Sequence, residues 1–346
     1  MMSLLFALLV QSCLFFDPAY TSYILGDESD AKASPTGGVC LMGGAGEDDE
    51  AMRWFLRRAK GGDVLVLRAS GADGYNKYMF ETLGVEVNSV QSIVFHDKRA
   101  SYDPYVQQQV ANAEAIWLAG GNQWNYVRFW RNTPIDSIIN ANIKDKKIAI
   151  GGLSAGMAIM GSIYFSAELS SIQSPEALQD PLSDTLSIDN QSFLNIPFLQ
   201  NVITDTHYAQ RNRQGRHVAF LAKAYQKFGI PAKGIACDEG VAVCIDINGK
   251  AYVYGAYPEQ DHSAYFIQTN CELPDASPEI CTLKKPLHWS RNDSALKVYQ
   301  IKAAPNGKHY FDLNDWKTGN GGDWKNWYVI KGEWKVNDSK SLHCKK

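Results

Sequence analysis

From Gly37 onward, short apolar runs alternate with stretches of helical character, and this alternation constrains the fold more than any other feature of the sequence. The first segments read VCLMGG, EDDEAMRWFLRRAK, DVLVLRAS and YNKYMFETLG, and later apolar runs read SIVF, AIWLAGG, KIAIGGL and GIACDEG. Strands that are almost entirely apolar are typical of sheets buried on both faces, and alternation with helices favours parallel pairing. We therefore expect an α/β fold with a doubly wound, mostly parallel sheet and helices on both faces.

The chain changes character after about Tyr257. Loops, two cysteines and the tail FDLNDWKTGNGGDWKNWYVIKGEW replace the alternating pattern, and this tail holds four of the nine tryptophans. Such a concentration of aromatic residues favours strands over a linker. We expect a main domain over residues 37–270, a β-rich accessory segment over residues 271–346, and a leader over residues 1–30.

The charge balance of the chain gives no global field that would attract nucleic acid. Its 34 basic and 37 acidic residues leave a formal net charge of −3, whereas nucleic-acid-binding domains carry basic patches. The 45% of hydrophobic residues among 346 positions is enough to bury a full core. We expect no nucleic-acid partner, and a ligand that is recognised by a local site.

The opening MMSLLFALLVQSCLFF is an apolar segment with the length of a signal-peptide core, and it is short for a membrane span. It lacks a basic residue before the apolar run and a clear small-x-small cleavage site, so a buried N-terminal segment and a lipid-modified Cys13 are alternatives. We interpret it as a secretory signal. The mature chain is then expected to begin between Phe16 and Pro35, in a secreted or extracytoplasmic protein without a membrane span.

Six cysteines remain once this leader is set aside, an even number that fits an oxidising compartment. Cys271 and Cys281 bracket ELPDASPEI, a loop that contains proline and aspartate outside any periodic pattern. We expect these two residues to form a disulfide. No cysteine spacing resembles a zinc site.

Ser154 lies between glycines in KIAIGGLSAGMAIMG, where an expected strand meets an expected helix. Gly-x-Ser-x-Gly at such a junction can form a nucleophile elbow, or it can be a tight turn whose serine caps the helix. Gly152 and Gly156 would allow a sharp turn, and the first free N–H groups of the helix could stabilise an oxyanion. The motif alone does not decide between these two interpretations.

Three segments that contain polar residues, AGGNQ, GGLSAG and ACDEG, follow expected strands, and the ligands of α/β sheets collect at the carboxyl ends of strands. A serine nucleophile needs a base, and the base needs an acid. Of the seven histidines, His207 is the best placed, because ITDTHYAQRNRQGR follows an apolar stretch. The acid could be Asp205, or one of Asp238 and Glu239 at the end of GIACDE.

Arg211, Arg213 and Arg216 cluster at the expected start of a helix over QRNRQGRHVAFLAKAYQKFGIP. Cations at a helix N-terminus oppose the macrodipole and repel one another, so an anion should compensate them. That anion could be Asp205 or a neighbouring carboxylate. It could equally be a substrate carboxylate held by the planar guanidinium groups.

Taken in order, AGGNQ, GGLSAGMAI, DTHYAQRNRQGR and GIACDE resemble the cyanophycinase family of serine peptidases, which shares its fold with aspartyl dipeptidases and, more distantly, with class I glutamine amidotransferase-like proteins. The resemblance spans roughly residues 37–257. It implies that Ser154 is the nucleophile, His207 the general base and Glu239 the acid that orients the base. The positions at which the family holds its substrate match Gln123, Asp205, Arg211, Arg213 and Arg216.

The resemblance also implies a reaction, the cleavage of β-aspartyl links in cyanophycin, a polyaspartate that bears arginine on its side-chain carboxyls, and it implies no metal or organic cofactor. We expect the N–H groups of Gly121 and Ala155 to receive the oxyanion. Asn122 and Thr206 depart from the family pattern, which usually has Asp and Gln there. Because Thr206 offers fewer hydrogen-bonding groups than glutamine, substrate choice is less determined than reaction type.

We therefore expect a secreted serine exopeptidase that hydrolyses aspartyl or β-aspartyl bonds through an acyl-enzyme and releases β-Asp-Arg dipeptides from a peptide or cyanophycin-like substrate. One alternative is an aspartyl dipeptidase that acts on short peptides. Another is a non-catalytic secreted binding protein of the same fold, with the Trp-rich tail as its contact surface. A homodimer is compatible with each.

Overall fold

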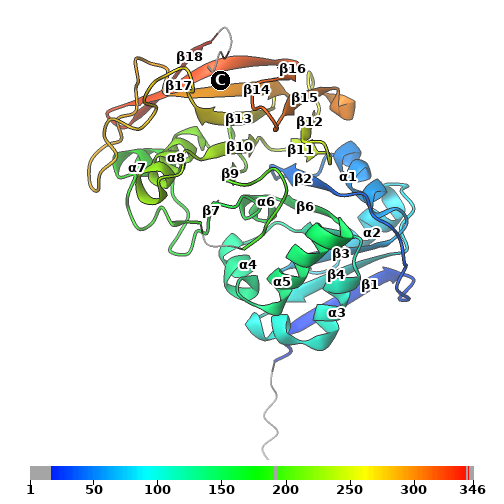
Figure 1. The fold of residues 1–346 in the computed structure, drawn as a ribbon. Coiled ribbons are helices and arrows are strands. Elements are labelled where there is room, and N and C mark those ends of the chain that lie inside the picture. Colours follow the sequence, from blue (N-terminus) through cyan, green and yellow to red (C-terminus); the bar gives the residue numbers. More distant parts are fainter. Residues whose placement is uncertain (1–16, 191–192, 340–341, 343–346) are drawn as a thin grey trace, which may run out of the picture.

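The computed structural model describes residues 17–190, 193–339 and 342, so the apolar part of the expected leader lies outside the described residues. Two large sheets organise the chain (Figure 1). The central sheet has the strand order β1-β4-β3-β5-β6-β2-β11-β12-β15-β16. Its strands are β1 (Tyr20–Gly26), β2 (Gly38–Met42), β3 (Asp63–Arg68), β4 (Ser89–Phe95), β5 (Ala115–Leu118), β6 (Ala149–Leu153), β11 (Ala242–Ile245), β12 (Lys250–Tyr254), β15 (His309–Asp312) and β16 (Gly319–Asn320).

The middle of this sheet is parallel, as the sequence predicts. Strands β4, β3, β5, β6 and β2 pair in parallel, and antiparallel strands flank them on both sides. Alternate residues of each strand enter different hydrophobic clusters: Val39 and Leu41 of β2 face one cluster, and Cys40 and Met42 face another. Burial on both faces is the physical reason why these strands are almost entirely apolar.

Helices cover both faces of the central sheet, which confirms the predicted α/β architecture. Residues of α1 (Asp49–Leu56) and of the turn after α2 (Gly74–Lys77) pack in the cluster on one face. The other face is covered by α3 (Pro104–Asn112), α4 (Gln123–Trp130) and α5 (Pro134–Ala141). Two short helices, α6 (Ala155–Ala158) and α7 (Ser174–Gln179), and the long α8 (Gln214–Phe228) complete the set, and β7 (Tyr164–Phe165) pairs with β8 (Ile188–Asp189).

The second large sheet departs from the expectation, because GIACDEG does not join the central sheet. Its strand β10 pairs in parallel with β9 and antiparallel with β13. The sheet runs β18-β17-β14-β13-β10-β9, with β9 (Val202–Asp205), β10 (Lys233–Cys237), β13 (Ser263–Thr269), β14 (Leu296–Lys302), β17 (Gly322–Ile330) and β18 (Glu333–Asp338). Residues of β10 are buried on both faces here too. An apolar run indicates burial, but it does not indicate which sheet provides it.

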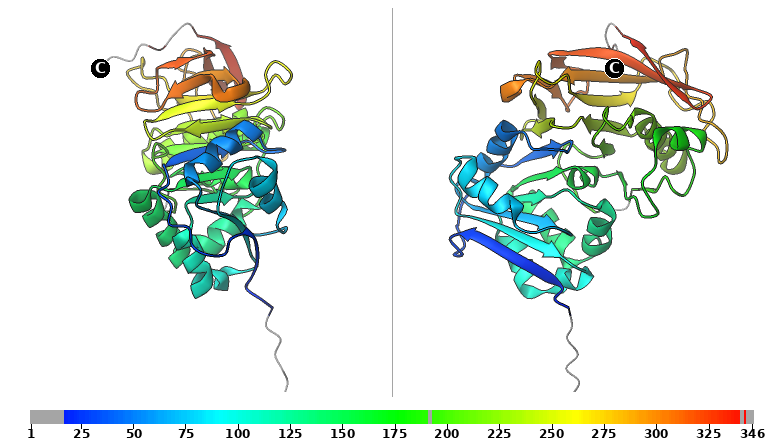
Figure 2. Two further views of the ribbon diagram at one scale, coloured as in Figure 1. Left: turned by 90° about the vertical axis from the view of Figure 1, so that its right-hand side faces the viewer. Right: turned by 180° about the vertical axis from the view of Figure 1, so that it is seen from behind.

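The accessory segment over residues 271–346 is rich in strands, as expected, and its strands lie together at one end of the molecule, far from the start of β1 (Figures 1 and 2). Strands β14, β17 and β18 extend the second sheet, whereas β15 and β16 extend the central sheet. Because β14 pairs with β13 along its whole length, the accessory segment completes sheets that begin earlier in the chain. The proposed boundary between residues 270 and 271 stays a prediction.

Residues 20–26, which fall within the expected leader, form the edge strand β1. Each of its seven residues pairs with a residue of β4, from Tyr20 opposite Phe95 to Gly26 opposite Ser89. The apolar segment that motivated the leader lies before Asp17. Within the described residues, no helix is long and apolar enough to cross a membrane.

The predicted Cys271–Cys281 disulfide is wrong, because Cys281 carries a free thiol. This thiol is buried, and burial raises its pKa to about 12. Cys271 is not among the free cysteines of the described chain. The short loop between the two residues made a bridge attractive, but Cys281 packs into a core cluster with residues such as Leu178 and Trp289.

Candidate active site

Ser154 lies at the turn between β6 and α6, and its backbone has the conformation of a nucleophile elbow. Its φ of 53° and ψ of −112° are unfavourable for a residue with a side chain, at a cost of about 1–3 kcal/mol. A Cβ on Gly156 would lie 2.0 Å from the carbonyl oxygen of Leu118, and one on Gly152 would lie 2.7 Å from Gly156, so the turn needs both glycines. The Ser154 side chain makes no capping hydrogen bond to α6, which removes the support for the helix-cap interpretation.

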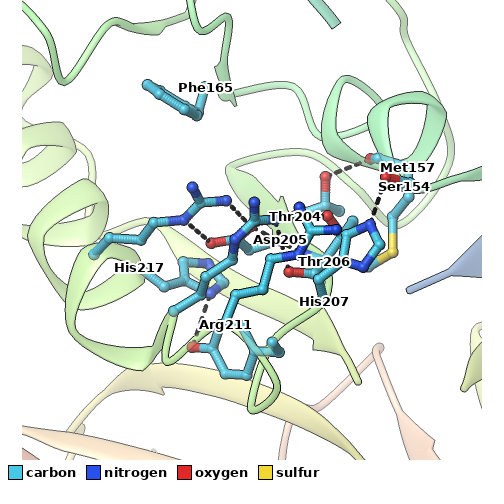
Figure 3. A network of polar contacts seen from close by, with 12 residues as sticks. Ser154, Met157, Phe165, Thr204, Asp205, Thr206, His207, Arg211 and His217 are labelled. Carbon is cyan, nitrogen blue, oxygen red and sulfur yellow. Dashed lines mark hydrogen bonds and ion pairs between the residues drawn. The ribbon is translucent and has the colours of Figure 1, made fainter. Parts of the chain in front are cut away.

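A chain of hydrogen bonds joins three of the predicted residues. The Oγ atom of Ser154 lies 2.8 Å from Nε2 of His207, and Nδ1 of His207 lies 2.6 Å from Oε1 of Glu239. Ser154 and His207 point toward one another in Figure 3. A proton on Nδ1, held by Glu239, leaves Nε2 free to accept the serine proton. This is the arrangement that nucleophilic catalysis by a serine requires.

Gly43 and Gly44, which follow β2, lie against His207. The sequence pattern did not indicate a role for them. The backbone N–H of His207 donates to the carbonyl of Gly43 at 3.0 Å. A Cβ on Gly44 would lie 2.4 Å from Cε1 of the His207 ring, and Gly44 has a φ of +116°, which favours glycine. Their position at the carboxyl end of a central strand was the signal that could have identified them.

The two neighbouring acids Asp238 and Glu239 have different roles. Asp238 is buried and accepts hydrogen bonds from the backbone N–H groups of Ala209 and Ser263, both at 2.8 Å. Glu239 is partly exposed, and its carboxylate is the one that reaches His207. Asp238 therefore links the loops around Ala209 and Ser263, while Glu239 contacts the imidazole of His207.

The environment of His207 favours the neutral imidazole. Burial lowers the pKa of His207, the hydrogen bond that its Nδ1 donates to Glu239 opposes this effect, and the positive charges of Arg211 and Arg213 add to the lowering. The net direction is below the ordinary value of 6.5. A base that stays unprotonated near neutral pH can accept a proton from Ser154 without first losing one.

Asp205 and Arg216 form a sealed ion pair rather than an open binding site. Nε and Nη2 of Arg216 lie 2.8 and 2.5 Å from the two carboxylate oxygens, and both side chains are buried. Burial alone would raise the pKa of Asp205, but the charge and hydrogen bonds of Arg216 lower it below its usual value. Asp205 is thus the anion that compensates Arg216, the first of the two alternatives drawn from the sequence.

Arg216 is the only member of the arginine cluster that lies within α8, because the helix begins at Gln214. The expectation that all three arginines occupy its first turn is wrong. The hydroxyl of Ser174 accepts a hydrogen bond from the N–H of Arg216 at 3.0 Å, which satisfies one of the free donors at this helix start. Arg213 is the N-cap residue of α8 and makes no side-chain capping hydrogen bond, and Arg211 lies before it.

Arg213 folds back over Thr206. Its Nη1 donates to the carbonyl and to the hydroxyl of Thr206, at 2.9 and 3.1 Å, and lies 3.7 Å from Asp205. Its buried Nε has no hydrogen-bond partner among the described residues, and burial lowers the pKa of Arg213 to about 10. Thr206, where the family pattern usually has glutamine, is buried and gives its hydroxyl to this arginine.

Arg211 is the arginine of the cluster that faces solvent, beside Glu239. Its side chain is 51% exposed, and its Nε lies 3.9 Å from Oε1 of Glu239. At this distance, the two groups interact through charge without a hydrogen bond. Most of the donors of this guanidinium therefore remain available to a bound carboxylate.

The AGGNQ segment passes beside Ser154. A Cβ on Gly120 would lie 3.8 Å from Cβ of Ser154. The side chain of Asn122 accepts a hydrogen bond from the N–H of Trp124 and caps α4, a task that Asn performs as well as the Asp usual in the family. Gln123 donates its amide to the carbonyl of Phe165 at 2.7 Å, so its Nε2 holds the loop that borders the site.

The backbone donors predicted for the oxyanion are Gly121 and Ala155. Gly121 is exposed in the same segment, and Ala155 is the first residue of α6, where backbone N–H groups have no partner within the helix. The N–H of Ser154 is already used, since it donates to the carbonyl of Met42 at 3.0 Å. The assignment of the oxyanion to Gly121 and Ala155 stays a prediction.

Parts of this chain are similar to known proteins. The curated cyanophycinase of Geminocystis herdmanii is 27% identical over 203 residues, which is 56% of this chain and 70% of that protein. The cyanophycinase of Trichormus variabilis is 25% identical over 228 residues, 63% of this chain and 70% of that protein. A crystal structure of a peptidase from an acI-B1 actinobacterium covers 64% of this chain and 89% of its own, at 16% identity and a TM-score of 0.45.

The sequence model of peptidase family S51 matches residues 73–252, which is just over half of the chain. The matched range contains Ser154, His207 and Glu239. This chain therefore belongs to peptidase family S51.

Proposed function

We propose that this peptidase is of the serine type and hydrolyses aspartyl or β-aspartyl bonds through an acyl-enzyme. The observation that carries the proposal is the continuous chain from Ser154 through His207 to Glu239, with both links at hydrogen-bond distance. Ser154 Oγ attacks the scissile carbonyl while Nε2 of His207 takes its proton. Glu239 stabilises the imidazolium that forms and keeps the ring oriented.

The remaining steps use the same groups. The N–H groups of Gly121 and Ala155 receive the developing oxyanion, and His207 gives its proton to the leaving amine. A water molecule then attacks the acyl-enzyme, with His207 again as the base, and Ser154 is released with its proton restored. The lowered pKa of His207 supports this cycle, because the ring is neutral at the start of each half-reaction.

The charge at the site supports an acidic substrate. Arg211 presents a half-exposed guanidinium 3.9 Å from the carboxylate of Glu239, where it can bind a free carboxylate of an aspartyl residue. The curated relatives are cyanophycinases, which supports cyanophycin or a similar polymer as the substrate and β-Asp-Arg dipeptides as the products. Thr206 favours a site with fewer amide contacts to the substrate than a glutamine would give.

The experiment is a comparison of three substrate classes. Purified protein is incubated with cyanophycin, with β-Asp-Arg and with α-aspartyl dipeptides, and the products are identified by mass spectrometry, with Ser154→Ala as the control. We expect dipeptides from cyanophycin and no products from the control. Hydrolysis of the dipeptides alone would support an aspartyl dipeptidase. No hydrolysis of any of them would contradict the proposal in favour of a binding protein.

We also propose that the chain is exported and that cleavage occurs before Tyr20. A later site would remove residues of β1, which pairs with β4 along its whole length. N-terminal sequencing of the protein from its native source measures this directly. A chain that begins between Phe16 and Tyr20 is expected, and retention of Met1 on a cytosolic protein would contradict export.

A further inference from the structure

Cys40 and Cys244 face one another across the junction of β2 and β11. They occupy directly opposite positions in this antiparallel pair, and their sulfur atoms lie 3.7 Å apart. Both side chains are fully buried, and both thiols are free. Neither residue belongs to the hydrogen-bonded chain of Ser154, His207 and Glu239.

Cys40 and Cys244 form the kind of antiparallel pair in which opposite side chains lie closest together. Gly43 lies opposite Val241, one position beyond the pairing of Met42 with Ala242, and its N–H donates to the Val241 carbonyl at 2.9 Å. Hydrogen-bonded and non-hydrogen-bonded pairs alternate along an antiparallel ladder. Cys40 and Cys244 are therefore a non-hydrogen-bonded pair, a type in which Cα atoms typically lie about 4.5 Å apart, a separation within the range of disulfides.

Cys40 and Cys244 share one hydrophobic cluster, and the other two free cysteines of the described residues lie in different clusters. Both belong to the hydrophobic cluster under α1, on one face of the central sheet. Cys237 belongs to the cluster on the other face of β2, where its sulfur lies 3.8 Å from the carbonyl of Leu41. Cys281 belongs to a third cluster under α8. The backbone of β2 thus separates Cys40 from Cys237.

We propose that Cys40 and Cys244 form a cross-strand disulfide when the chain folds under oxidising conditions. The thiolate of one cysteine attacks a small disulfide such as oxidised glutathione and releases one thiol. The thiolate of the second cysteine then attacks the mixed disulfide and releases the second thiol. The two protein sulfurs are oxidised by two electrons, the oxidant is reduced to two thiols, and these take up the two protons lost by the cysteines.

The disulfide would link β2 to β11, the two strands next to the loops that carry Gly44 and Glu239. Strand β2 leads into Gly43 and Gly44, which hold His207, and β11 follows shortly after Glu239. The two loops already meet, since the N–H of Gly240 donates to the Gly44 carbonyl at 3.0 Å. The disulfide would stabilise this arrangement by restricting the unfolded chain, and it depends neither on the proposed substrate nor on the proposed export.

Burial determines when the bridge can form. It raises the pKa of Cys244 well above its ordinary value, so the folded protein holds this thiol protonated and away from solvent. The thiolate is the reacting form, and access limits its reaction. Oxidation is therefore expected while the chain folds, and the folded, reduced protein should react slowly.

The test compares the full chain refolded from denaturant with oxidised and reduced glutathione and the same chain refolded with dithiothreitol. Free thiols are alkylated under denaturing conditions, and the peptides are mapped without reduction. We expect a linked Cys40–Cys244 peptide in the oxidised sample alone, with Cys237 and Cys281 alkylated in both. The same mapping on protein produced in an oxidising and in a reducing compartment needs no refolding. Alkylated Cys40 and Cys244 in folded, oxidised protein would overturn the proposal.

A matched pair of variants gives a second measurement. Oxidation during folding should raise the denaturant midpoint of the wild type and of Cys237→Ala by the same amount. In Cys244→Ala, which cannot form the bridge, the shift should be smaller. An equal shift in all three proteins would assign the effect to another bond and would overturn the proposal.

Discussion

Two hydrogen-bonded pairs, Asp205–Arg216 and His207–Glu239, begin two residues apart at the end of β9, and they differ in their access to solvent. The side chains of Asp205 and Arg216 are 2% and 4% exposed, whereas those of His207 and Glu239 are 7% and 27% exposed. The buried pair has both carboxylate oxygens occupied by one guanidinium. The open pair leaves Nε2 of His207 directed at Ser154. Asp205 therefore makes a buried contact that stabilises the fold, whereas His207, two residues later, makes a contact that is open to a reaction.

The two pairs differ in the state of the residue that remains when its partner is removed. A carboxylate or guanidinium that loses its partner in the sealed pair becomes an uncompensated buried charge, which is strongly destabilising. Glu239 remains in contact with solvent when it loses its partner, so water can compensate it. Changes at the sealed pair should therefore reduce stability, and changes at the open pair should reduce activity.

The largest effect is expected at Ser154 and His207, the proposed nucleophile and base. Ser154→Ala and His207→Ala should each lower kcat by about three orders of magnitude or more, because each removes an essential member of the same unit. The double variant should lose little more than either single variant. Initial rates on the substrate that the wild type cleaves fastest measure this. Additive losses would show that the two residues act independently.

A large loss of stability is expected at the sealed pair. Asp205→Ala leaves the buried Arg216 without its bidentate partner and should lower the free energy of unfolding by about 3–5 kcal/mol. Denaturant unfolding checks this, with Glu81→Ala as the matched control. Glu81 belongs to an exposed helical pair with Lys77, so its removal should cost less than about 1 kcal/mol. Similar values for both variants would contradict the contrast between sealed and exposed pairs.

A smaller loss is expected on acidification, through His217 beside the sealed pair. Burial lowers the pKa of His217 from 6.5 to about 4 in the folded protein. The unfolded chain binds the proton more tightly, so this contribution is fully present above pH 6.5 and is lost as the pH falls toward 4. The loss amounts to about 3 kcal/mol. His217→Gln should flatten the dependence of unfolding free energy on pH in this window, and an unchanged slope would contradict the assignment.

The smallest expected effect is a shift in the pH profile through Arg211. The positive charge of Arg211 helps to lower the pKa of His207. Arg211→Gln should therefore raise this pKa and move the acidic limb of kcat/KM to higher pH, whereas Arg211→Lys keeps the charge and should leave the limb in place. Arg211→Lys should still reduce turnover, because lysine lacks the planar fork. Coincident limbs for Arg211→Gln and the wild type would exclude the electrostatic role.

The central strands and the positions of Ser154 and His207 could be predicted from the sequence. They follow from the spacing of apolar residues and from the place of polar residues at the ends of expected strands. Apolar runs identified the central strands, and polar residues after those runs identified Ser154 and His207. The sequence could not predict that Glu239 contacts His207 while Asp238 binds backbone N–H groups, because adjacent residues of one loop point in different directions. The arginine cluster was ambiguous for a similar reason, since spacing in the chain does not show which guanidinium meets Asp205.

Two further features depend on long-range packing. The assignment of β10 to a second sheet depends on its neighbours β9 and β13, and an apolar run carries no information about them. The state of Cys281 depends on the core cluster around it, whereas the sequence offers only its distance from Cys271. Contacts between segments distant in the chain decide both features.

The two carboxylates, exchanged one at a time for their amides, give the most direct comparison of the sealed and open pairs. Glu239→Gln and Asp205→Asn keep the shape of each side chain and remove its charge, and hydrolysis and unfolding are measured on the same sample of each. Glu239→Gln should lower kcat by about two orders of magnitude and change the free energy of unfolding by less than about 1 kcal/mol. Asp205→Asn should lose about 3 kcal/mol of stability and keep more of its kcat while folded. A Glu239→Gln protein with the wild-type rate, or an Asp205→Asn protein with wild-type stability, would contradict the account.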